Sequence, residues 1–268
     1  MLYQSIRHLV IMITILFSFA ACGKEEVSEN AARLRIKLTD AASPVISELY
    51  IDIRQIEVYA TDTTGNDGEW VPLSFTGGEY NILQLMNGKT VQLVDQYFPA
   101  GKKIEKIKLI LGNNNRFLTV TSENIPLNIP PEIAEGIIME NVNATLADHI
   151  ITSIVMDINA ALTVRESNGN YFLNPAARAF PETYGGKLRG FVEPVEAVAF
   201  IAVVHDGDTL LTLPEADGMF LFPGLEPALW NLTVFADTTT IYRDTVINDI
   251  EVLAGEVADP GIIQLHND

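Results

Sequence analysis

Residues 49–60 have the sequence LYIDIRQIEVYA, in which apolar and polar residues alternate. Apolar residues occupy every second position up to Ile53 and again from Ile56 onward. Such alternation is typical of a strand with one buried face, because successive side chains of a strand point to opposite sides. A phase change of one residue would turn the faces over, so the stretch predicts a β-bulge at Arg54–Gln55.

The same period continues on both sides of this stretch. Further strands are expected at residues 34–38, 70–73, 91–94, 103–111, 117–121, 150–158, 171–173 and 176–180. A short helix is predicted over residues 82–86, with Asn81 as its cap and Asn87-Gly88 as a left-handed stop. Residues 125–136 contain three prolines and no periodicity, so they are expected to form a surface loop. Many strands with one short helix predict an all-β sandwich.

A second unit is expected after the Gly- and Pro-containing joint at residues 181–186. Its predicted strands are residues 188–192, 198–204, 209–213, 219–222, 229–236, 241–247 and 261–265. Seven short strands with regular turns indicate a small sandwich. The predicted fold is therefore all-β, with two β-sandwich domains in tandem at residues 33–180 and 187–268.

The first 21 residues have the composition of a secretory signal peptide. Arg7 precedes an apolar run from Leu9 to Phe17, which is too short to span a bilayer stably. Small residues follow and end at Cys22, the only cysteine of the chain. Residues 19–22, FAAC, resemble the lipobox of bacterial lipoproteins, in which the cysteine is diacylated and becomes the new N-terminus. The resemblance implies a signal peptide at 1–21 and a lipidated tether at 22–32.

The residues after Cys22 also resemble an export signal. Lys24, Glu25 and Glu26 resemble the short Lys-plus-acidic signal that directs Bacteroidetes lipoproteins to the outer face of the outer membrane. The resemblance implies a surface-exposed outer-membrane lipoprotein. A periplasm-facing anchor, with these residues serving only as a charged tether, is the alternative.

Composition excludes several other classes of protein. The formal net charge is −18, so the protein would be repelled by nucleic acid, and no basic stripe offsets this. If Cys22 carries lipid, no thiol remains for a disulfide or a thiolate metal site. No second apolar run approaches the roughly 20 residues that cross a bilayer.

Motifs for catalysis or cofactor binding are incomplete. Gly88-Lys89-Thr90 ends like a phosphate-binding loop, but Leu83 stands where that loop needs its first glycine. Residues 205–208, HDGD, could form a calcium or acid–base loop, although Asp-Gly between two strands is the expected hairpin turn. Residues 62–67 lack the glycine register of a calcium loop. The sequence therefore predicts no catalytic residue, no metal site and no cofactor.

Two surface features remain open. Tyr59, Trp70, Tyr80 and Tyr97 could form an aromatic platform for sugars, or they could be ordinary core and cross-strand residues. Four Asp-Thr pairs resemble the Asp-Ser/Thr-apolar O-glycosylation signal of Bacteroidetes, and chance in a chain rich in both residues is the alternative. Their candidate acceptors are Thr63, Thr209, Thr238 and Thr245.

An ordered series of segments resembles the family of the domain of unknown function 4382. It comprises LTD at residues 38–40, LYIDI at 49–53, YNILQLMNG at 80–88, FPAG at 98–101, IKLIL at 107–111, VNAT at 142–145 and residues 174–179. The resemblance covers roughly residues 33–180. It implies an envelope β-domain of a bacterial lipoprotein, with no established activity.

The second unit resembles the carboxypeptidase regulatory-like, transthyretin-like modules. The resemblance rests on GKLRGFV at residues 186–192, DGMFLFPGL at 217–225 and LWNLTV at 229–234. It implies a seven-stranded sandwich that accompanies another domain and has no catalysis of its own.

Three classes of function are compatible with these features. The leading hypothesis is a non-enzymatic, surface-anchored lipoprotein for binding, adhesion or envelope organisation. Its expected partners are the membrane, through the lipid, and a glycan or an envelope or matrix protein, but no nucleic acid. The first alternative is a fimbrillin-like assembly subunit, processed at Arg33 or Arg35 before the first strand. The second alternative is an envelope polysaccharide hydrolase that uses a carboxylate pair.

Overall fold

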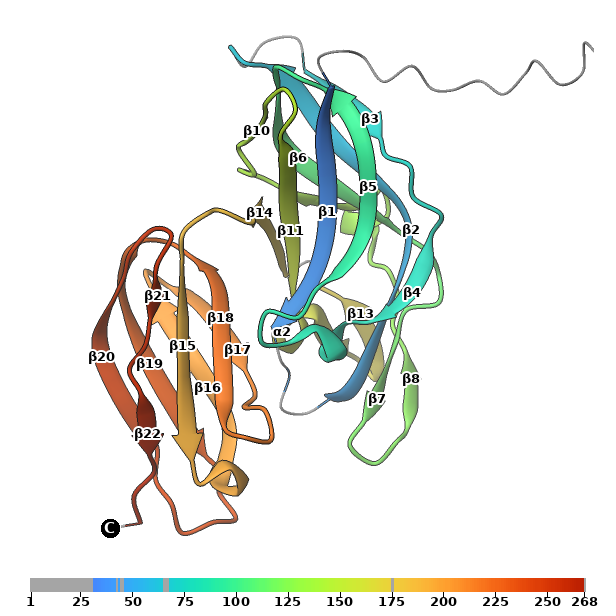
Figure 1. The fold of residues 1–268 in the computed structure, drawn as a ribbon. Coiled ribbons are helices and arrows are strands. Elements are labelled where there is room, and N and C mark those ends of the chain that lie inside the picture. Colours follow the sequence, from blue (N-terminus) through green and yellow to red (C-terminus); the bar gives the residue numbers. More distant parts are fainter. Residues whose placement is uncertain (1–30, 42, 44–45, 65–67, 175, 268) are drawn as a thin grey trace, which may run out of the picture.

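The computed structural model describes residues 31–41, 43, 46–64, 68–174 and 176–267. The predicted signal peptide and the predicted lipidation and export residues, Cys22 and Lys24 to Glu26, lie outside these ranges. The described chain is almost entirely β-structure, which confirms the all-β fold class (Figure 1).

Residues 31–181 form the first set of strands and short helices. The strands are β1 (Ala31–Ala41), β2 (Ile46–Asp62), β3 (Glu69–Pro72), β4 (Gly78–Asn81), β5 (Val91–Pro99), β6 (Lys102–Leu111), β7 (Arg116–Thr119), β8 (Asn124–Pro126), β9 (Ile137–Met139), β10 (Ala144–Leu146), β11 (Ile151–Asn159), β12 (Val164–Ser167), β13 (Asn170–Leu173) and β14 (Ala177–Pro181). The helices are the 3-10 turns η1 (Ile82–Leu85) and η2 (Pro131–Ile133) and the single-turn α2 (Ala160–Thr163).

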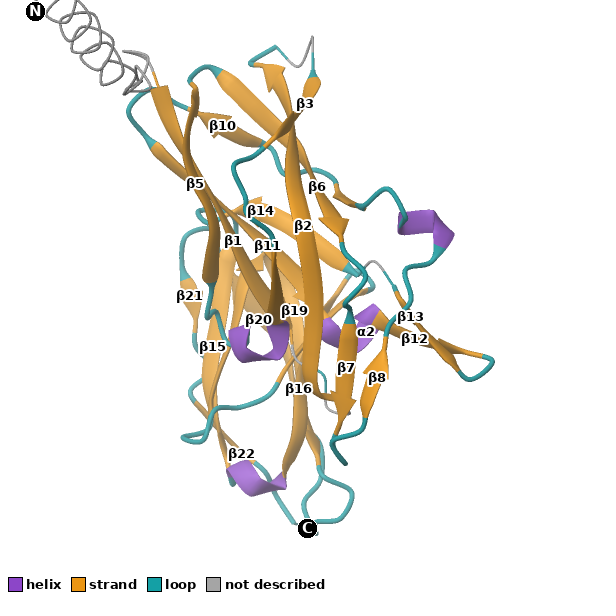
Figure 2. Cartoon of the chain, turned by 90° about the vertical axis from the view of Figure 1, so that its right-hand side faces the viewer, coloured by secondary structure: helices purple, strands orange, loops and turns teal. Residues whose placement is uncertain are grey.

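Residues 186–264 form the second set. Its elements are β15 (Gly186–Glu193), η3 (Val195–Ala197), β16 (Val198–His205), β17 (Asp208–Thr212), β18 (Met219–Leu225), β19 (Ala228–Ala236), β20 (Thr245–Val252), β21 (Val257–Ala258) and β22 (Ile262–Gln264). Figure 2 shows that strands dominate both sets and that the helices are short caps between them.

Two sheets enclose the core of the first unit. One has the strand order β14-β11-β1-β5, with β1 parallel to β11 and antiparallel to β5. The other has the order β10-β6-β2-β7-β8, with β3 and β4 paired to β2 and β9 paired to β6. The inward side chains form one apolar cluster, which includes the fully buried Leu34, Ile36 and Leu38 of β1. The alternation of β1 in the sequence is therefore the alternation between this core and the opposite face of the sheet.

The bulge in β2 lies where the sequence predicts it. The register between β2 and β6 shifts between Ile53 and Gln55. Ile53 and Ile56 are both fully buried, whereas Arg54 between them is exposed. One extra residue thus keeps both halves of a 17-residue strand facing the same core.

Two expectations for the first unit are wrong. Residues 125–136 are not a simple surface loop, because they include part of β8 and all of η2, and Leu127 and Ile133 are buried. Asn81 does not cap η1 with its side chain. Its Oδ1 instead accepts a hydrogen bond from the backbone N–H of Leu49 at 3.3 Å, which joins β4 to β2. The left-handed stop is confirmed, with φ of 56° at Asn87 and 75° at Gly88.

The second unit also consists of two sheets. One has the order β18-β15-β21, with β22 also paired to β15, and the other has the order β17-β16-β19-β20. Apolar side chains between them form a separate cluster that includes Leu188, Phe220 and Trp230. A strand predicted over residues 241–247 begins only at Thr245. The preceding residues are held in turns, where the Asp237 carboxylate accepts a hydrogen bond from Thr239 N.

The two units lie side by side and are joined by residues 182–185 (Figure 1). The ends of β1, β11 and β14 and the turn after η1 face the strands β17 and β18 of the second unit. Contacts across this junction create the clefts described next.

Candidate functional site

Asn87 connects the two units through its side chain. Its Nδ2 donates to Leu213 O at 3.0 Å and to Glu215 Oε1 at 3.1 Å. Its Oδ1 accepts from Thr212 Oγ1 at 2.9 Å and from Leu221 N at 3.1 Å. The amide therefore bridges the carbonyl just after β17 and an N–H of β18. Because Asn87 is 8% exposed, these groups have little access to water as a substitute.

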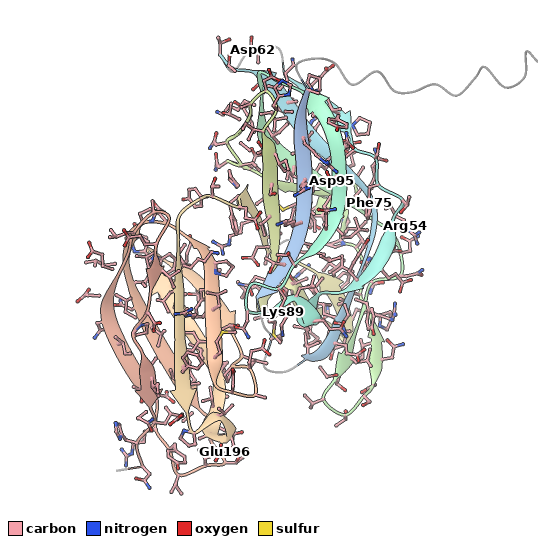
Figure 3. The ribbon with its side chains drawn as sticks, viewed as in Figure 1. Arg54, Asp62, Phe75, Lys89, Asp95 and Glu196 are labelled. Carbon is pink, nitrogen blue, oxygen red and sulfur yellow. The ribbon has the colours of Figure 1, made fainter. Side chains whose placement is uncertain are left out.

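The residues after Asn87 extend this contact. The left-handed Gly88 lies so close to Leu221 that a Cβ would be 2.6 Å from its Cδ2. Lys89 Nζ pairs with Glu215 Oε1 at 2.6 Å. The ammonium of Lys89, followed by the amide of Asn87, lowers the pKa of the Glu215 carboxyl below its ordinary value of 4.5. Lys89 is labelled at the junction in Figure 3.

Arg178 forms the second connection between the units. Its Nε and Nη2 donate to Asp157 Oδ2 at 2.9 and 2.8 Å. Its Nη1 donates to Gly224 O at 2.8 Å and its Nη2 to Pro223 O at 3.0 Å. Asp157 is 5% exposed, so the guanidinium neutralises a buried carboxylate of β11 and at the same time binds the backbone of β18.

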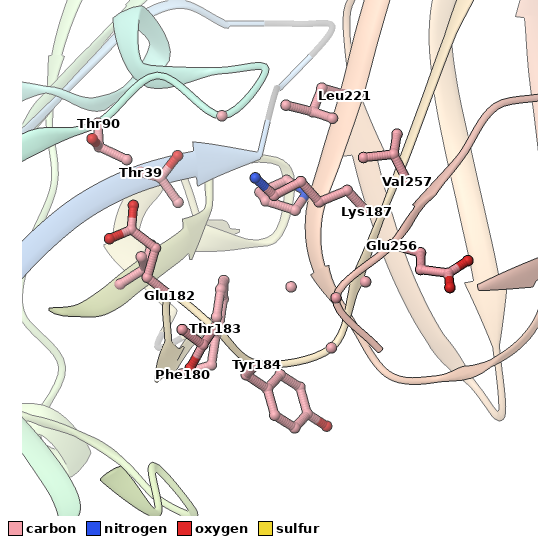
Figure 4. Close-up of a pocket in the computed structure, with 17 residues that line it drawn as sticks. Thr39, Thr90, Phe180, Glu182, Thr183, Tyr184, Lys187, Leu221, Glu256 and Val257 are labelled. Carbon is pink, nitrogen blue, oxygen red and sulfur yellow. The ribbon is translucent and has the colours of Figure 1, made fainter. Parts of the chain in front are cut away.

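A cleft of about 380 Å³ lies beside the linker between the units (Figure 4). Glu182, Tyr184 and Lys187 lie around it, together with Thr39 from β1. Much of its polar lining is already engaged. The Thr39 hydroxyl donates to Leu85 O and Lys89 O, and Glu182 pairs with Lys37 at 2.8 Å. The Lys37 ammonium lowers the pKa of Glu182.

Two further pockets open elsewhere along the junction. Their volumes are about 450 and 570 Å³, and they adjoin each other, because both are lined by Arg178, Asp208 and Trp230. We call the two pockets together the junction cleft. Pockets of this size accommodate small organic ligands. The first pocket also includes Asn141, Asn143, Phe180, Tyr184, His205 and Glu226, and the second includes Asp157, Asn159, Leu162, Ala177 and Leu210.

The hairpin predicted at residues 205–208 is confirmed and lies on the junction cleft. Asp206 and Gly207 have φ of 47° and 91°, as a two-residue turn between β16 and β17 requires. His205 Nδ1 lies 3.0 Å from Leu229 O, and its ring lies 5.2 Å from that of Trp230. The turn therefore explains the Asp-Gly pair, while its flanking His205 and Asp208 line the cleft.

The four aromatic residues considered as a sugar platform do not form one surface. Tyr59 and Trp70 are cross-strand partners with ring centroids 5.4 Å apart, and Lys108 Nζ lies 4.3 Å from the Trp70 ring. Tyr80 stacks on Phe75 (labelled in Figure 3). Tyr97 is 54% exposed, at the other sheet. The cross-strand interpretation therefore holds for the first pair.

The candidate glycosylation threonines occupy different environments. Thr63, Thr209 and Thr238 are exposed, whereas Thr245 is half-buried. Some of the neighbouring aspartates have a local structural role. Asp62 accepts hydrogen bonds from the N–H and hydroxyl of Thr64, and Asp237 does the same for Thr239. Glycosylation of these threonines stays a prediction.

The candidate processing residues Arg33 and Arg35 lie inside β1 rather than before it. Both guanidinium groups pair with Asp95 of the neighbouring β5. Asp95 is labelled in Figure 3. The Arg33 guanidinium, with help from Arg35, lowers the pKa of the Asp95 carboxyl. A protease would therefore have to reach residues that are hydrogen-bonded on both sides.

Within the described ranges, no group of three or more His, Cys, Asp or Glu side chains is arranged to hold a metal ion. The same residues include no helix with the length and apolar character needed to cross a membrane.

The chain belongs to the family described as Domain of unknown function (DUF4382), whose model matches residues 31–175. That match covers β1 to β13, including Asn87 and most of the first unit's side of the junction. No curated protein matches the chain.

Several solved structures of bacterial proteins align with the chain at low similarity. The Bacillus anthracis TIE protein is 11% identical with a TM-score of 0.21, over 88% of this chain and 34% of that one. A fimbrial protein from Bacteroides ovatus is 11% identical with a TM-score of 0.26, over 88% and 50%. The shaft pilin SpaA from Lactobacillus rhamnosus GG is 8% identical with a TM-score of 0.22, over 88% and 97%. The chain thus spans about a third and a half of the first two proteins, and TM-scores this low carry no argument about function.

The sequence alone missed the residues that join the units. Asn87 is visible in the sequence only as a helix stop, and its partners lie about 130 positions further along the chain. Arg178 and Asp157 belong to ordinary strand patterns. Only the pairing of β11 with β14 brings them together, and only the packing of the second unit supplies Pro223 and Gly224.

Proposed function

We propose that this protein is a non-enzymatic lipoprotein of the outer membrane that binds a ligand at the cell surface, in adhesion or envelope organisation. The observation that carries the proposal is the junction cleft, which lies between the two β units and is lined by aromatic, amide and carboxylate side chains. Recognition sites are often placed between domains in this way. In this proposal Cys22 carries the lipid anchor, and Lys24 to Glu26 form the signal for export to the outer face of the membrane.

Anchoring and orientation can be tested on intact cells. Proteinase K is added to cells that express the chain with a C-terminal tag, and the tag is detected by blotting. The wild-type tag is expected to disappear, whereas a Lys24→Ala/Glu25→Ala/Glu26→Ala variant is expected to be protected. A Cys22→Ala variant controls for lipidation and should leave the membrane fraction. Protection of wild type would contradict surface exposure and favour the periplasm-facing alternative.

Binding without catalysis can be tested with the purified full chain. Retention on columns of envelope glycans or of matrix and envelope proteins should occur without release of new reducing ends or peptides. If retention is lost when the junction cleft is blocked, that result would support the cleft as the ligand-binding site. Steady release of reducing ends would instead support the hydrolase alternative. Absence of any retained partner would overturn the proposal.

The fimbrillin-like alternative also has one structural observation in its favour. β1 is flanked by β11 and β5 and contributes fully buried side chains, so its removal would leave an apolar groove that a strand from another copy could fill. It requires loss of the lipid-bearing N-terminus, displacement of β1 from its sheet, and ladders that resist mild denaturation. A lipidated monomer that keeps its N-terminus throughout growth would exclude it.

The second unit is proposed to be a transthyretin-like accessory module. Its two facing sheets and separate apolar cluster are compatible with that assignment. In this proposal the module contributes one wall of the binding cleft and has no reaction of its own.

A further inference from the structure

The junction cleft contains two buried oxygen atoms that have no hydrogen-bond partner among the described residues. They are Asp157 Oδ1 and Asn159 Oδ1, on alternate positions of β11, and both residues line the larger pocket. Asp157 is 5% exposed. Buried polar atoms without partners are costly, so a pair of them beside one cleft indicates a site where donors are supplied by something that enters it.

The charge of these residues is already balanced. Both donors that reach Asp157 come from Arg178, and both bind Oδ2, which leaves the covered Oδ1 without a donor. The same guanidinium is held by Pro223 O and Gly224 O, so it is fixed in place. Asn159 is neutral, and its Nδ2 contacts Thr209 O at 3.4 Å. The two oxygens therefore need hydrogen-bond donors but no additional positive charge.

The rest of the pocket combines apolar walls with an acidic rim. Leu162, Leu210 and Trp230 supply apolar surface, and Leu162 is 52% exposed at the opening. Asp208, which borders both pockets, and Glu226 of the adjoining one are exposed and can accept hydrogen bonds while staying partly solvated. Anionic ligands would be repelled by this rim. A ligand with many hydroxyl donors and an apolar face matches both the walls and the acceptors.

We propose that the junction cleft binds a neutral saccharide: Asp157 and Asn159 rotate their covered Oδ1 atoms toward the cleft to accept from its hydroxyls, while one sugar face packs against Leu162 and Leu210. The inference deepens the proposed function and rests on it. The pocket volume of about 570 Å³ limits the recognised unit to a few sugar residues.

Calorimetric titration of the full chain tests the inference, with the protein in a detergent that has no sugar headgroup. The probes are neutral trisaccharides of glucose, mannose, galactose, xylose and N-acetylglucosamine. Counter-probes are putrescine, calcium chloride and a trisaccharide of galacturonic acid. At least one neutral trisaccharide should bind, and the counter-probes should not compete with it. The chain has two tryptophans, so fluorescence of a Trp70→Phe variant reports on Trp230 alone and locates the binding.

Matched variants separate the cleft from the surrounding surface. Leu162→Lys removes an apolar wall and places a long cation over the acceptors, and Asn159→Ala removes one acceptor; each should weaken binding about tenfold or more. Leu229→Lys is the control, because Leu229 is 53% exposed and lies outside the cleft lining. Near-UV circular dichroism confirms that each variant is folded.

Three results would overturn the inference: no binding of any neutral trisaccharide, equal binding by the Leu162→Lys and Leu229→Lys variants, or binding of putrescine or calcium at the Trp230 site instead. These results are distinct from failure of the proposed function. If the chain binds no trisaccharide but is retained on an envelope or matrix protein, the proposed function stands and the saccharide inference is wrong. If the chain neither binds a trisaccharide nor is retained on any partner, both the saccharide inference and the proposed function are wrong.

Discussion

Asn87 and Asn168 share one backbone conformation but have different side-chain environments. Each precedes a glycine and has a positive φ, of 56° and 53°. Asn168 is exposed in the hairpin turn between β12 and β13, whereas the amide of Asn87 forms hydrogen bonds to four groups of the second unit. Comparing substitutions at the two positions therefore separates two contributions to stability: the free-energy cost of a residue with positive φ, and the hydrogen bonds across the junction.

Asn87→Ala is expected to lower the free energy of unfolding by at least about 2 kcal/mol more than Asn168→Ala does, because it removes all four hydrogen bonds that this buried side chain makes to the second unit. The Asn168 variant should lose only the preference of asparagine for positive φ, about 1 kcal/mol. Urea unfolding of both variants measures this difference. Equal losses would show that the junction hydrogen bonds contribute nothing.

Glu215 makes the junction sensitive to acid. Its pKa is lowered from 4.5 in the folded chain by Lys89 and then Asn87. A carboxyl with a depressed folded pKa stabilises the fold above its unfolded pKa, and this contribution is lost as pH falls through the folded value. Wild type should therefore exceed Glu215→Gln in stability at neutral pH, and the difference should vanish at pH well below 4.5.

Unfolding of both proteins across this pH range measures the effect, which should be small because Lys89 is more than half exposed. Added salt should reduce it further. A difference that persists unchanged in acid would mean that Glu215 acts through packing and not through its charge.

At the scale of elements, the bulge in β2 shifts the register of the strand by one residue, so that both halves face the core. Deleting Gln55 would remove the extra residue and turn one half of the strand over. Either the segment ending at Ile53 or the segment from Ile56 would then face away from the core. Each large apolar side chain so displaced costs about 1.5–3 kcal/mol, so the deletion is expected to prevent folding.

Gln55→Ala is the matched control, because it keeps the residue count and changes only a half-buried side chain. It should fold with a near-native unfolding midpoint. Expression level and circular dichroism distinguish the two. A folded deletion variant would show that the register of β2 can adjust elsewhere.

The strands themselves were largely predictable, because alternation records which residues face a core. The alternation of residues 34–38 and of 49–60 matches the burial of β1 and β2, except at Asp52, which is fully buried although it lies in the polar phase. The prediction was less accurate where burial does not alternate. β11 is buried without interruption from Ile154 to Ile158, since β1 and β14 flank it and Val155 lines the cleft beside the second unit.

At the scale of the whole molecule, Arg178 should decide how firmly the two units hold each other. Arg178→Ala leaves the Asp157 carboxylate buried without its counter-ion and removes the hydrogen bonds to Pro223 O and Gly224 O. The expected loss is about 3–5 kcal/mol in the free energy of unfolding. Small-angle scattering should also show a broader range of arrangements of the two units.

Arg165→Ala is the control, because Arg165 is exposed on β12, and its loss should stay within about 0.5 kcal/mol. An Arg178→Ala/Asp157→Asn double variant should recover part of the stability, because it removes the uncompensated charge. No recovery would place the whole effect in the hydrogen bonds to the second unit.

The sequence by itself determined the all-β class, the β2 bulge, the left-handed stop at Asn87 and the hairpin at residues 205–208. Each depends on local chemistry: side-chain period, backbone conformation at Asn and Gly, and turn preference. The tertiary structure alone decided that β1 lies parallel to β11, that Asn87 and Arg178 bind the second unit, and that Asp157 and Asn159 line the same pocket. These features arise from contacts between residues up to about 130 positions apart, and such contacts produce no period or motif in the sequence around either partner.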